Sequence, residues 1–269
     1  LNYLFIYGHF GFTAMGTDGA ALASAIATVF GTVIYISVGL FKLNHLNIFK
    51  FRLKVSDLTT VFKLTIPAGA QQLMIAVGVT SLFWMVGRLG VAELAALNIL
   101  INILMLCILP GFGFGMAAAT LVGTSLGEKD MLSAKQWAYD VAKVGGVTTL
   151  IIGALISFFA APILTVFTTD TETIDMALRA LQMTGALIFI DVMSVIMMNS
   201  LLGSGDVTIV LKTSLFFQWL VFFPLGCVLV FFFQPSFLLI WSVFMFSRLG
   251  QGAVYINYWR KDKWGKAKI

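Results

Sequence analysis

Long apolar stretches alternate with short polar ones along almost the whole chain. A membrane-spanning helix needs about 20 predominantly apolar residues, and most of these stretches reach or exceed that length. The pattern therefore predicts an all-α, polytopic integral membrane bundle with about seven full transmembrane helices and part of another. The predicted spans are residues 1–10 (the tail of a span), 20–41, 61–86, 93–119, 139–166, 176–203, 212–233 and 237–258.

The composition agrees with a lipid environment. Apolar residues make up 59% of the 269 residues, charged residues only 11%, and the mean hydropathy is +0.97. This balance excludes intrinsic disorder, a secreted disulfide scaffold and a nucleic-acid-binding domain. Cys107 and Cys227 lie inside apolar stretches and are interpreted as packing residues, and His9 and His45 are too few for a histidine metal cluster. Because the chain opens on Leu1 inside an apolar stretch, we expect a fragment that begins within a helix.

The basic residues lie in alternate connections, which predicts the orientation of the chain. Cytoplasmic loops of membrane proteins are enriched in Lys and Arg, so these connections and the C-terminus are expected to be cytoplasmic. The opposite connections hold Arg88 and Arg179 beside several acidic residues. A lipid-headgroup patch is the weaker interpretation of the basic tail. The residues assigned to the cytoplasmic side are Lys42, Lys50, Arg52, Lys54, Lys63, Lys129, Lys135, Lys143, Lys212, Arg260, Lys261, Lys263, Lys266 and Lys268.

Two ionisable residues lie near the centres of predicted spans, Asp191 in 176–203 and Arg248 in 237–258. A charge at mid-bilayer costs at least about 2.5–3.5 kcal/mol, so such a residue faces the bundle interior or a wet cavity and is a functional candidate. Asp191 is therefore the stronger functional candidate of the two. The alternative is a structural ion pair between Asp191 and Arg248 that fixes two helices together.

Further polar and polarisable side chains recur on three spans and are candidates for lining a substrate cavity. Spacings of three and four residues place some of them on one helix face, and recurrence near an acid favours a polar cavity. The alternative is that they form hydrogen bonds between helices, as amides and hydroxyls do in any membrane bundle. The cavity candidates, with Arg248, are Gln71, Gln72, Asn98, Asn102, Ser194, Met198 and Asn199.

Four stretches together resemble the MATE family, multidrug and toxic compound extrusion transporters. "MGTDGAALASAIA" at 15–27 is similar to the start of that family's sixth helix, and "RLGVAELAALNI" at 88–99 to its eighth. "LVGTSLGEKD" at 121–130, followed by Ala134, resembles the signature after the eighth helix, and "DVMSVIMMNSLLGSGD" at 191–206 resembles the tenth helix and its loop. The four occur in the family's order, and the region from the first to the last of them spans most of the chain.

The resemblance implies a fragment of a twelve-helix, two-lobe antiporter. It assigns 1–41 to the end of the N-terminal lobe, 42–60 to a cytoplasmic inter-lobe loop, 61–258 to the six-helix C-terminal lobe and 259–269 to a cytoplasmic basic tail. Asp191 occupies the place of a cation- or proton-binding aspartate in many members. Ile75 stands where sodium-coupled members usually have a glutamate, and Leu202 where an arginine is common.

The function implied is secondary active export of organic, cationic compounds in exchange for Na⁺ or H⁺, in the bacterial inner membrane. We expect no cofactor, no metal beyond Na⁺ at Asp191, no nucleic acid and no obligatory protein partner; the partners are drug-like organic cations and the lipid bilayer. The fragment alone is expected to be inactive.

The first alternative is a flippase for lipid-linked oligosaccharides or polysaccharides, which would need several basic residues in its cavity. A membrane-embedded enzyme ranks below it, because the chain offers no nucleophile or metal set, and a passive channel is a further alternative. No P-loop pattern occurs in the sequence.

Overall fold

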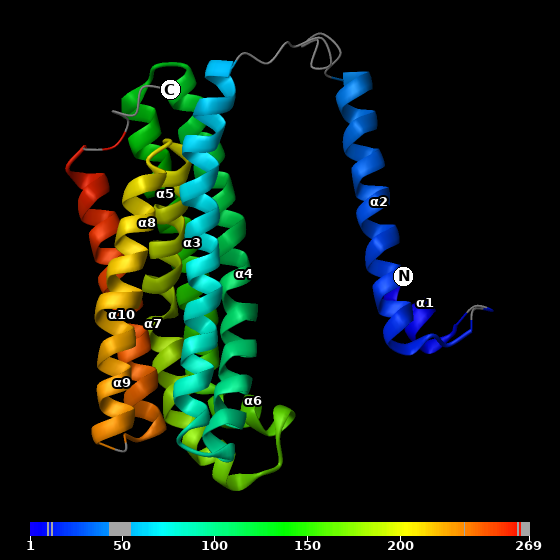
Figure 1. The fold of residues 1–269 in the computed structure, drawn as a ribbon, viewed down its shortest axis with the longest axis vertical. Coiled ribbons are helices and arrows are strands. Elements are labelled where there is room, and N and C mark those ends of the chain that lie inside the picture. The colour runs from blue at the N-terminus through cyan, green and yellow to red at the C-terminus, as the bar shows by residue number, and fades with distance from the viewer. Residues whose placement is uncertain (10, 12, 43–54, 234, 263, 265–269) are drawn as a thin grey trace. The chain divides into compact units, whose positions relative to one another are not determined.

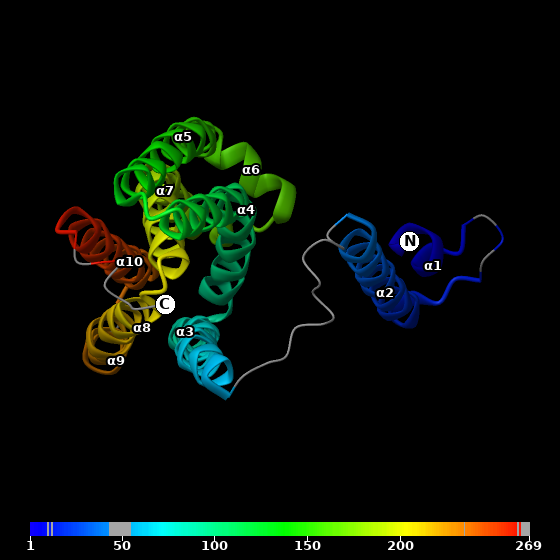
Figure 2. The ribbon, with the colours of Figure 1, turned by 90° about the horizontal axis from the view of Figure 1, so that it is seen from above.

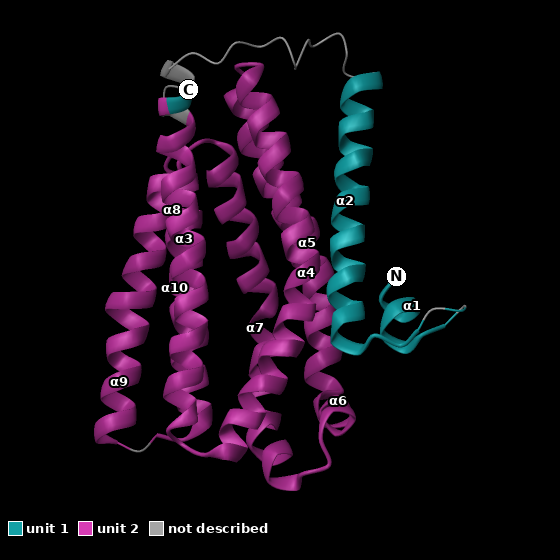
Figure 3. Cartoon of the chain, turned by 45° about the vertical axis from the view of Figure 1, so that its right-hand side comes forward, with its two compact units in different colours: residues 1–58 teal, residues 59–269 magenta. Residues whose placement is uncertain are grey.

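The computed structural model describes residues 1–9, 11, 13–42, 55–233, 235–262 and 264. The residues it describes form helices and short connections (Figure 1). They divide into two compact units, Leu1–Leu58 and Thr59–Ile269, which Figure 3 colours separately. Within the described part, seven helices are long and apolar enough to cross a membrane, which agrees with the predicted number of full spans.

The first unit contains a short helix and a long one. Helix α1 (Asn2–Tyr7) ends at Gly8, whose φ of 71° is the left-handed conformation that glycine adopts at little cost. Helix α2 (Gly16–Lys42) follows, and the backbone N–H of Met15 donates to the carbonyl of Phe5 at 2.9 Å. Large apolar side chains along α2, such as Phe30 and Tyr35, are exposed, as expected for a helix in lipid.

The second unit contains the other spans. One of them is divided in three, because α8 continues through the π-helix η3 into α9. The elements in chain order are α3 (Val55–Gly87), α4 (Val91–Gly127), α5 (Met131–Phe158), α6 (Ala160–Phe167), α7 (Thr171–Gly203), α8 (Val207–Leu215), η3 (Phe216–Phe222), α9 (Phe223–Phe232) and α10 (Phe237–Arg260).

Helix α7 is the central element of the second unit and packs against α4, α5 and α10, as the view along the bundle shows (Figure 2). Small residues allow these close contacts. A Cβ atom added at Gly185 would collide with the backbone of α5, and one added at Gly203 with the backbone of α4 at Ala119. Helices in membranes approach most closely where glycine and alanine line the interface.

The boundaries of two predicted spans, 139–166 and 93–119, are wrong. Helix α5 begins at Met131 rather than 139, because Asp130 caps it by accepting hydrogen bonds from the backbone N–H groups of Leu132 and Ser133 at 3.1 and 3.0 Å. The predicted span 139–166 is also interrupted at Phe159 and resumes as α6, with Pro162 in its first turn, where proline is tolerated. Helix α4 continues to Gly127 rather than 119.

The inter-lobe loop predicted at 42–60 overlaps the start of α3, which begins at Val55. Residues 43–54 of that loop, and 263 and 265–269 of the basic tail, lie outside the described residues.

The cap of α7 gives a prediction about stability and pH. Asp170 accepts hydrogen bonds from the hydroxyl and, at 3.0 Å, the backbone N–H of Thr173, and these contacts lower the pKa of the Asp170 carboxyl. Because this pKa is lowered on folding, the cap stabilises the fold above the unfolded pKa of about 3.9 and loses its effect as pH falls through the folded pKa. Asp170→Ala should therefore lower the thermal unfolding midpoint at pH 7, with the difference from the unsubstituted protein shrinking below about pH 4. Asp175→Ala, which removes an exposed carboxyl one turn further along α7, is the control, and an equal loss in both variants would contradict the prediction.

Candidate functional site

A cavity of about 170 Å³ lies within the second unit, bounded by residues of α3, α4, α7, α8, η3 and α10. Most of its lining is apolar, with isoleucine, leucine, methionine and phenylalanine side chains. Polar side chains interrupt this lining on several helices, and they include Gln72, Asp191, Ser194, Gln218, Arg248 and Gln251. A concave, mainly apolar cavity with a few converging polar groups is the usual form of a small-molecule site.

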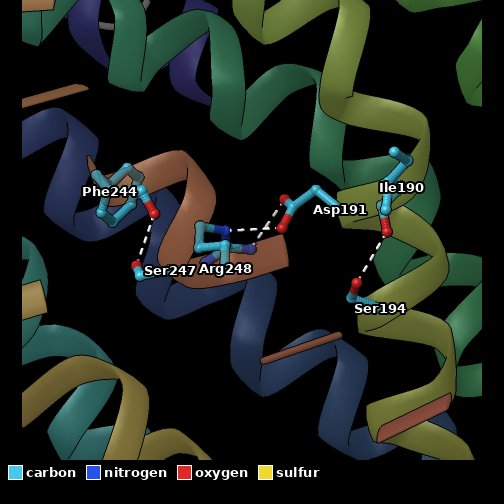
Figure 4. Close-up of polar contacts among 6 residues, drawn as sticks. All are labelled: Ile190, Asp191, Ser194, Phe244, Ser247 and Arg248. Carbon is cyan, nitrogen blue, oxygen red and sulfur yellow. Dashed lines mark hydrogen bonds and ion pairs between the residues drawn. The ribbon is translucent and has the colours of Figure 1, made fainter. Parts of the chain in front are cut away.

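Asp191 and Arg248 form a bidentate ion pair across the contact between α7 and α10 (Figure 4). The Nε of Arg248 donates to Oδ1 of Asp191 at 2.8 Å, and its Nη2 donates to Oδ2 at 2.9 Å. This fork geometry is the strongest arrangement of the two groups, and it is available to arginine but not to lysine. The ion pair that the sequence left open as an alternative is therefore present.

The register of the two helices explains why these residues meet. Two turns before the ion pair, the indole Nε1 of Trp241 donates to the hydroxyl of Thr184 at 2.9 Å. In both contacts the residue on α10 follows its partner on α7 by 57 positions in the sequence. Moving seven residues along α7 therefore corresponds to moving seven residues along α10, so the two helices run in the same direction and stay in register. The close packing continues at Gly252, where an added Cβ would collide with the Ser194 side chain.

The two charges differ in their exposure. The side chain of Asp191 is 3% exposed, whereas that of Arg248 is 26% exposed and lies beside the ring of Phe244, with 5.9 Å between the guanidinium carbon and the ring centroid. Arg248 thus covers Asp191, and its side chain is the more exposed of the two. Among the described residues, no group of three or more His, Cys, Asp and Glu side chains gathers to hold a metal ion. Within the described lining of the cavity, Asp191 is the residue with a carboxylate.

Several of the candidate residues line this cavity together. Gln72, Ser194 and Met198 do so with the ion pair. Ser194 directs its hydroxyl to the carbonyl of Ile190 at 2.8 Å. Gln71 lies behind the lining, where it is buried and its Nε2 lies 3.2 Å from the sulfur of Met198.

The three asparagine candidates lie outside the described lining. Asn98 and Asn102 are exposed on α4 and bond to each other, since Nδ2 of Asn102 donates to both the side-chain and backbone oxygens of Asn98 at 2.8 Å. Asn199 donates to the carbonyl of Val195 at 2.8 Å and packs against Gly115. The hydrogen bonds of these amides lie within their own helices rather than across the cavity.

Sequence reasoning missed several polar residues of the lining. Gln218 lies in the π-helix and donates to the carbonyl of Met74 on α3 at 2.8 Å, in a position that an α-helical register does not predict. Tyr255 and Ser214 share a hydrogen bond of 3.0 Å between α10 and α8. Gln251 could have been found, because it follows Arg248 by three residues and so shares its helix face.

These features define a multi-pass helical membrane protein with a mainly apolar cavity that contains an ion pair. The family model MatE matches residues 67–228, and the chain belongs to this family.

Two relatives named "Probable multidrug resistance protein NorM" illustrate the similarity. The protein from Pasteurella multocida is 32% identical over 235 residues, which cover 85% of this chain and 50% of the relative. The protein from Thermotoga maritima is 25% identical over 275 residues, covering 100% of this chain and 58% of the relative. The chain therefore spans little more than half the length of these curated relatives.

Solved structures of transporters share the fold. An outward-facing multidrug resistance MATE family transporter of the MOP superfamily superposes with a TM-score of 0.84 at 18% identity, covering 96% of this chain and 58% of that structure. A MOP superfamily transporter from Pyrococcus furiosus superposes with a TM-score of 0.80 at 19% identity and the same coverage.

Proposed function

We propose that the protein to which this chain belongs is a secondary active antiporter that exports organic compounds in exchange for inward Na⁺ or H⁺. The observation that carries the proposal is the buried carboxylate of Asp191, held in the cavity of a membrane-spanning bundle of the MatE family. Relatives named as multidrug resistance proteins support export of drug-like compounds.

The chemistry follows from competition for one carboxylate. In the structure Arg248 occupies both oxygens of Asp191. A proton or a sodium ion that binds Asp191 neutralises it and weakens its ion pair with Arg248, which changes the contact between α7 and α10. A coupling ion drives a conformational change only through its differential affinity for the two states, and an ion pair that exists in one of them supplies that difference.

The proposed orientation places the basic connections and the C-terminus in the cytoplasm. It is supported by the ion pair between Lys135, near the start of α5, and Asp262, just after α10, at 2.7 Å. This contact brings the basic connection before α5 and the beginning of the C-terminal tail to the same end of the second unit.

The flippase alternative is less favoured by the lining. A pyrophosphate headgroup would require several basic side chains, and among the described lining residues Arg248 alone carries a permanent positive charge, already paired with Asp191.

Asp191→Asn tests the proposal in the protein expressed from its complete reading frame. Ion-driven efflux of a cationic dye such as rhodamine 123 from proteoliposomes should fall at least about tenfold, because an amide neither titrates nor attracts a cation as a carboxylate does. Asp175→Asn, an exposed carboxyl on the same helix, should transport normally. Undiminished ion-driven efflux by Asp191→Asn would remove Asp191 from the mechanism.

A further inference from the structure

The charges that line the cavity cancel one another. Among the described lining residues, Asp191 and Arg248 carry the permanent charges, one negative and one positive, in direct contact. A site that selects organic cations by electrostatics needs a net negative lining, since complementary charge is what attracts one sign and excludes the other. This cavity presents a dipole instead.

The positive end of this dipole is the more accessible one. Asp191 is 3% exposed, and its two oxygens accept from Nε and Nη2 of Arg248. Within the described part of the chain, no hydrogen bond engages Nη1 of Arg248, and the Arg248 side chain is 26% exposed. Guanidinium groups bind carboxylates and phosphates through two parallel hydrogen bonds, so a substrate anion has a better approach than a substrate cation.

Partner exchange at a buried ion pair favours a substrate with both charges. A cation that displaced Arg248 from Asp191 would leave the guanidinium unpaired in a largely apolar cavity, and a simple anion would leave the carboxylate unpaired. Either outcome is strongly unfavourable, because an uncompensated charge of low exposure keeps its full desolvation cost. A zwitterion replaces both partners at once, and the rings of Phe217 and Phe244 in the lining supply contacts for an aromatic body.

We propose that the Asp191–Arg248 pair is a recognition site for amphipathic zwitterions, in which Arg248 binds the substrate's anionic group and Asp191 its cationic group. This proposal rests on the proposed export function and specifies its substrate class. Arg248 is then the residue that sets charge selectivity, and the coupling ion competes with the substrate's cationic group alone.

Three xanthene dyes of similar size but different charge test the proposal. Rhodamine 110 carries a free carboxylate and is a zwitterion, rhodamine 123 is its methyl ester and a cation, and fluorescein is an anion. Binding to the purified protein, expressed from its complete reading frame, is measured by fluorescence polarisation at pH 7. Rhodamine 110 should bind about tenfold more tightly than rhodamine 123 or fluorescein, as expected for one added charge-assisted hydrogen-bonded contact.

Variants of Arg248 and Asp191 test whether Arg248 is responsible for the tighter binding of rhodamine 110. Arg248→Gln should weaken rhodamine 110 about tenfold and strengthen rhodamine 123, because Asp191 is then free for a cation. The double variant Asp191→Asn with Arg248→Gln carries no buried charge, keeps the protein testable if the single variant folds poorly, and should bind the two rhodamines equally. Arg179→Gln, an exposed arginine of α7, is the matched control and should keep the unsubstituted protein's preference.

The outcomes separate this proposal from the export function. Ion-driven efflux of rhodamine 123 together with equal binding of the two rhodamines, or with equal effects of Arg248→Gln on both, would overturn zwitterion recognition and leave the export function standing. Absence of binding by all three dyes would overturn zwitterion recognition. Absence of ion-driven efflux of rhodamine 123 and rhodamine 110 would count against the export function, even if the binding preference is found.

Discussion

Replacing Arg248 with leucine is expected to lower the free energy of unfolding by about 3–5 kcal/mol, the usual cost of leaving one member of a buried ion pair without its partner. Asp191 is almost fully buried and both of its oxygens accept hydrogen bonds from Arg248. The measurement is equilibrium unfolding in mixed micelles. Arg179→Leu, which removes an exposed arginine on the neighbouring α7, is the control and should cost little. Equal stability of the two variants would contradict the assignment of Asp191 as a buried charge that depends on Arg248.

The double variant Asp191→Leu with Arg248→Leu should recover the stability that the single variant loses. Replacing both members of a buried ion pair by apolar side chains is often neutral or stabilising by about 1–4 kcal/mol. A double variant as unstable as Arg248→Leu would attribute the loss to packing around Phe244 rather than to the unpaired carboxylate. A stable double variant that no longer exports would show that the pair is retained for function and not for folding.

The spans were predictable because a helix that crosses a membrane must be apolar over about 20 residues, whatever its neighbours. The C-terminal end of α4 and the N-terminal end of α5 could not be predicted from hydropathy. A helix that projects beyond the hydrocarbon is no longer apolar there, although its backbone hydrogen bonds continue. Residues 120–138 read as a polar loop, although all but a three-residue connection is helical. The sequence signal for that boundary was the cap at Asp130, not hydropathy.

The candidate site was predictable in its charged residues and less so in its neutral ones. Asp191 and Arg248 could be identified because a charged side chain inside a membrane span is stable only in the bundle interior or in a wet cavity. The spacing of Asn98 and Asn102 correctly placed them on one face of α4. Spacing alone does not determine which face of a helix lines a cavity, and the face that carries these two residues is exposed. The position of Gln218 in the cavity lining was not predicted, because its contact with α3 depends on the π-helix. The π-helix shifts the register of the side chains that follow it.

The crossing of α5 and α7 offers the second large effect. Gly185→Leu is expected to destabilise the second unit by about 1–3 kcal/mol or more, since an added side chain there meets the backbone of α5 as well as the Ser157 hydroxyl. The new Cβ would collide with the carbonyl of Gly153 and with Ser157, whose hydroxyl now donates to the carbonyl of Gln182 at 2.9 Å. Helix α7 would have to move away from α5, and Asp191, two turns further along α7, would move with it.

Gly113→Leu is the matched control, because it makes the same change inside a helix at a position with open space around it. It should leave the unfolding free energy nearly unchanged, as leucine is also the better helix former. The two variants are compared by the yield of monodisperse protein in size-exclusion chromatography and by equilibrium unfolding in mixed micelles. Wild-type stability in Gly185→Leu, or an equal loss in Gly113→Leu, would contradict a close α5–α7 contact. Because α7 carries Asp191 and packs against α5 on one side and α10 on the other, loss of this contact should also abolish the ion pair, and with it the selectivity proposed for the cavity.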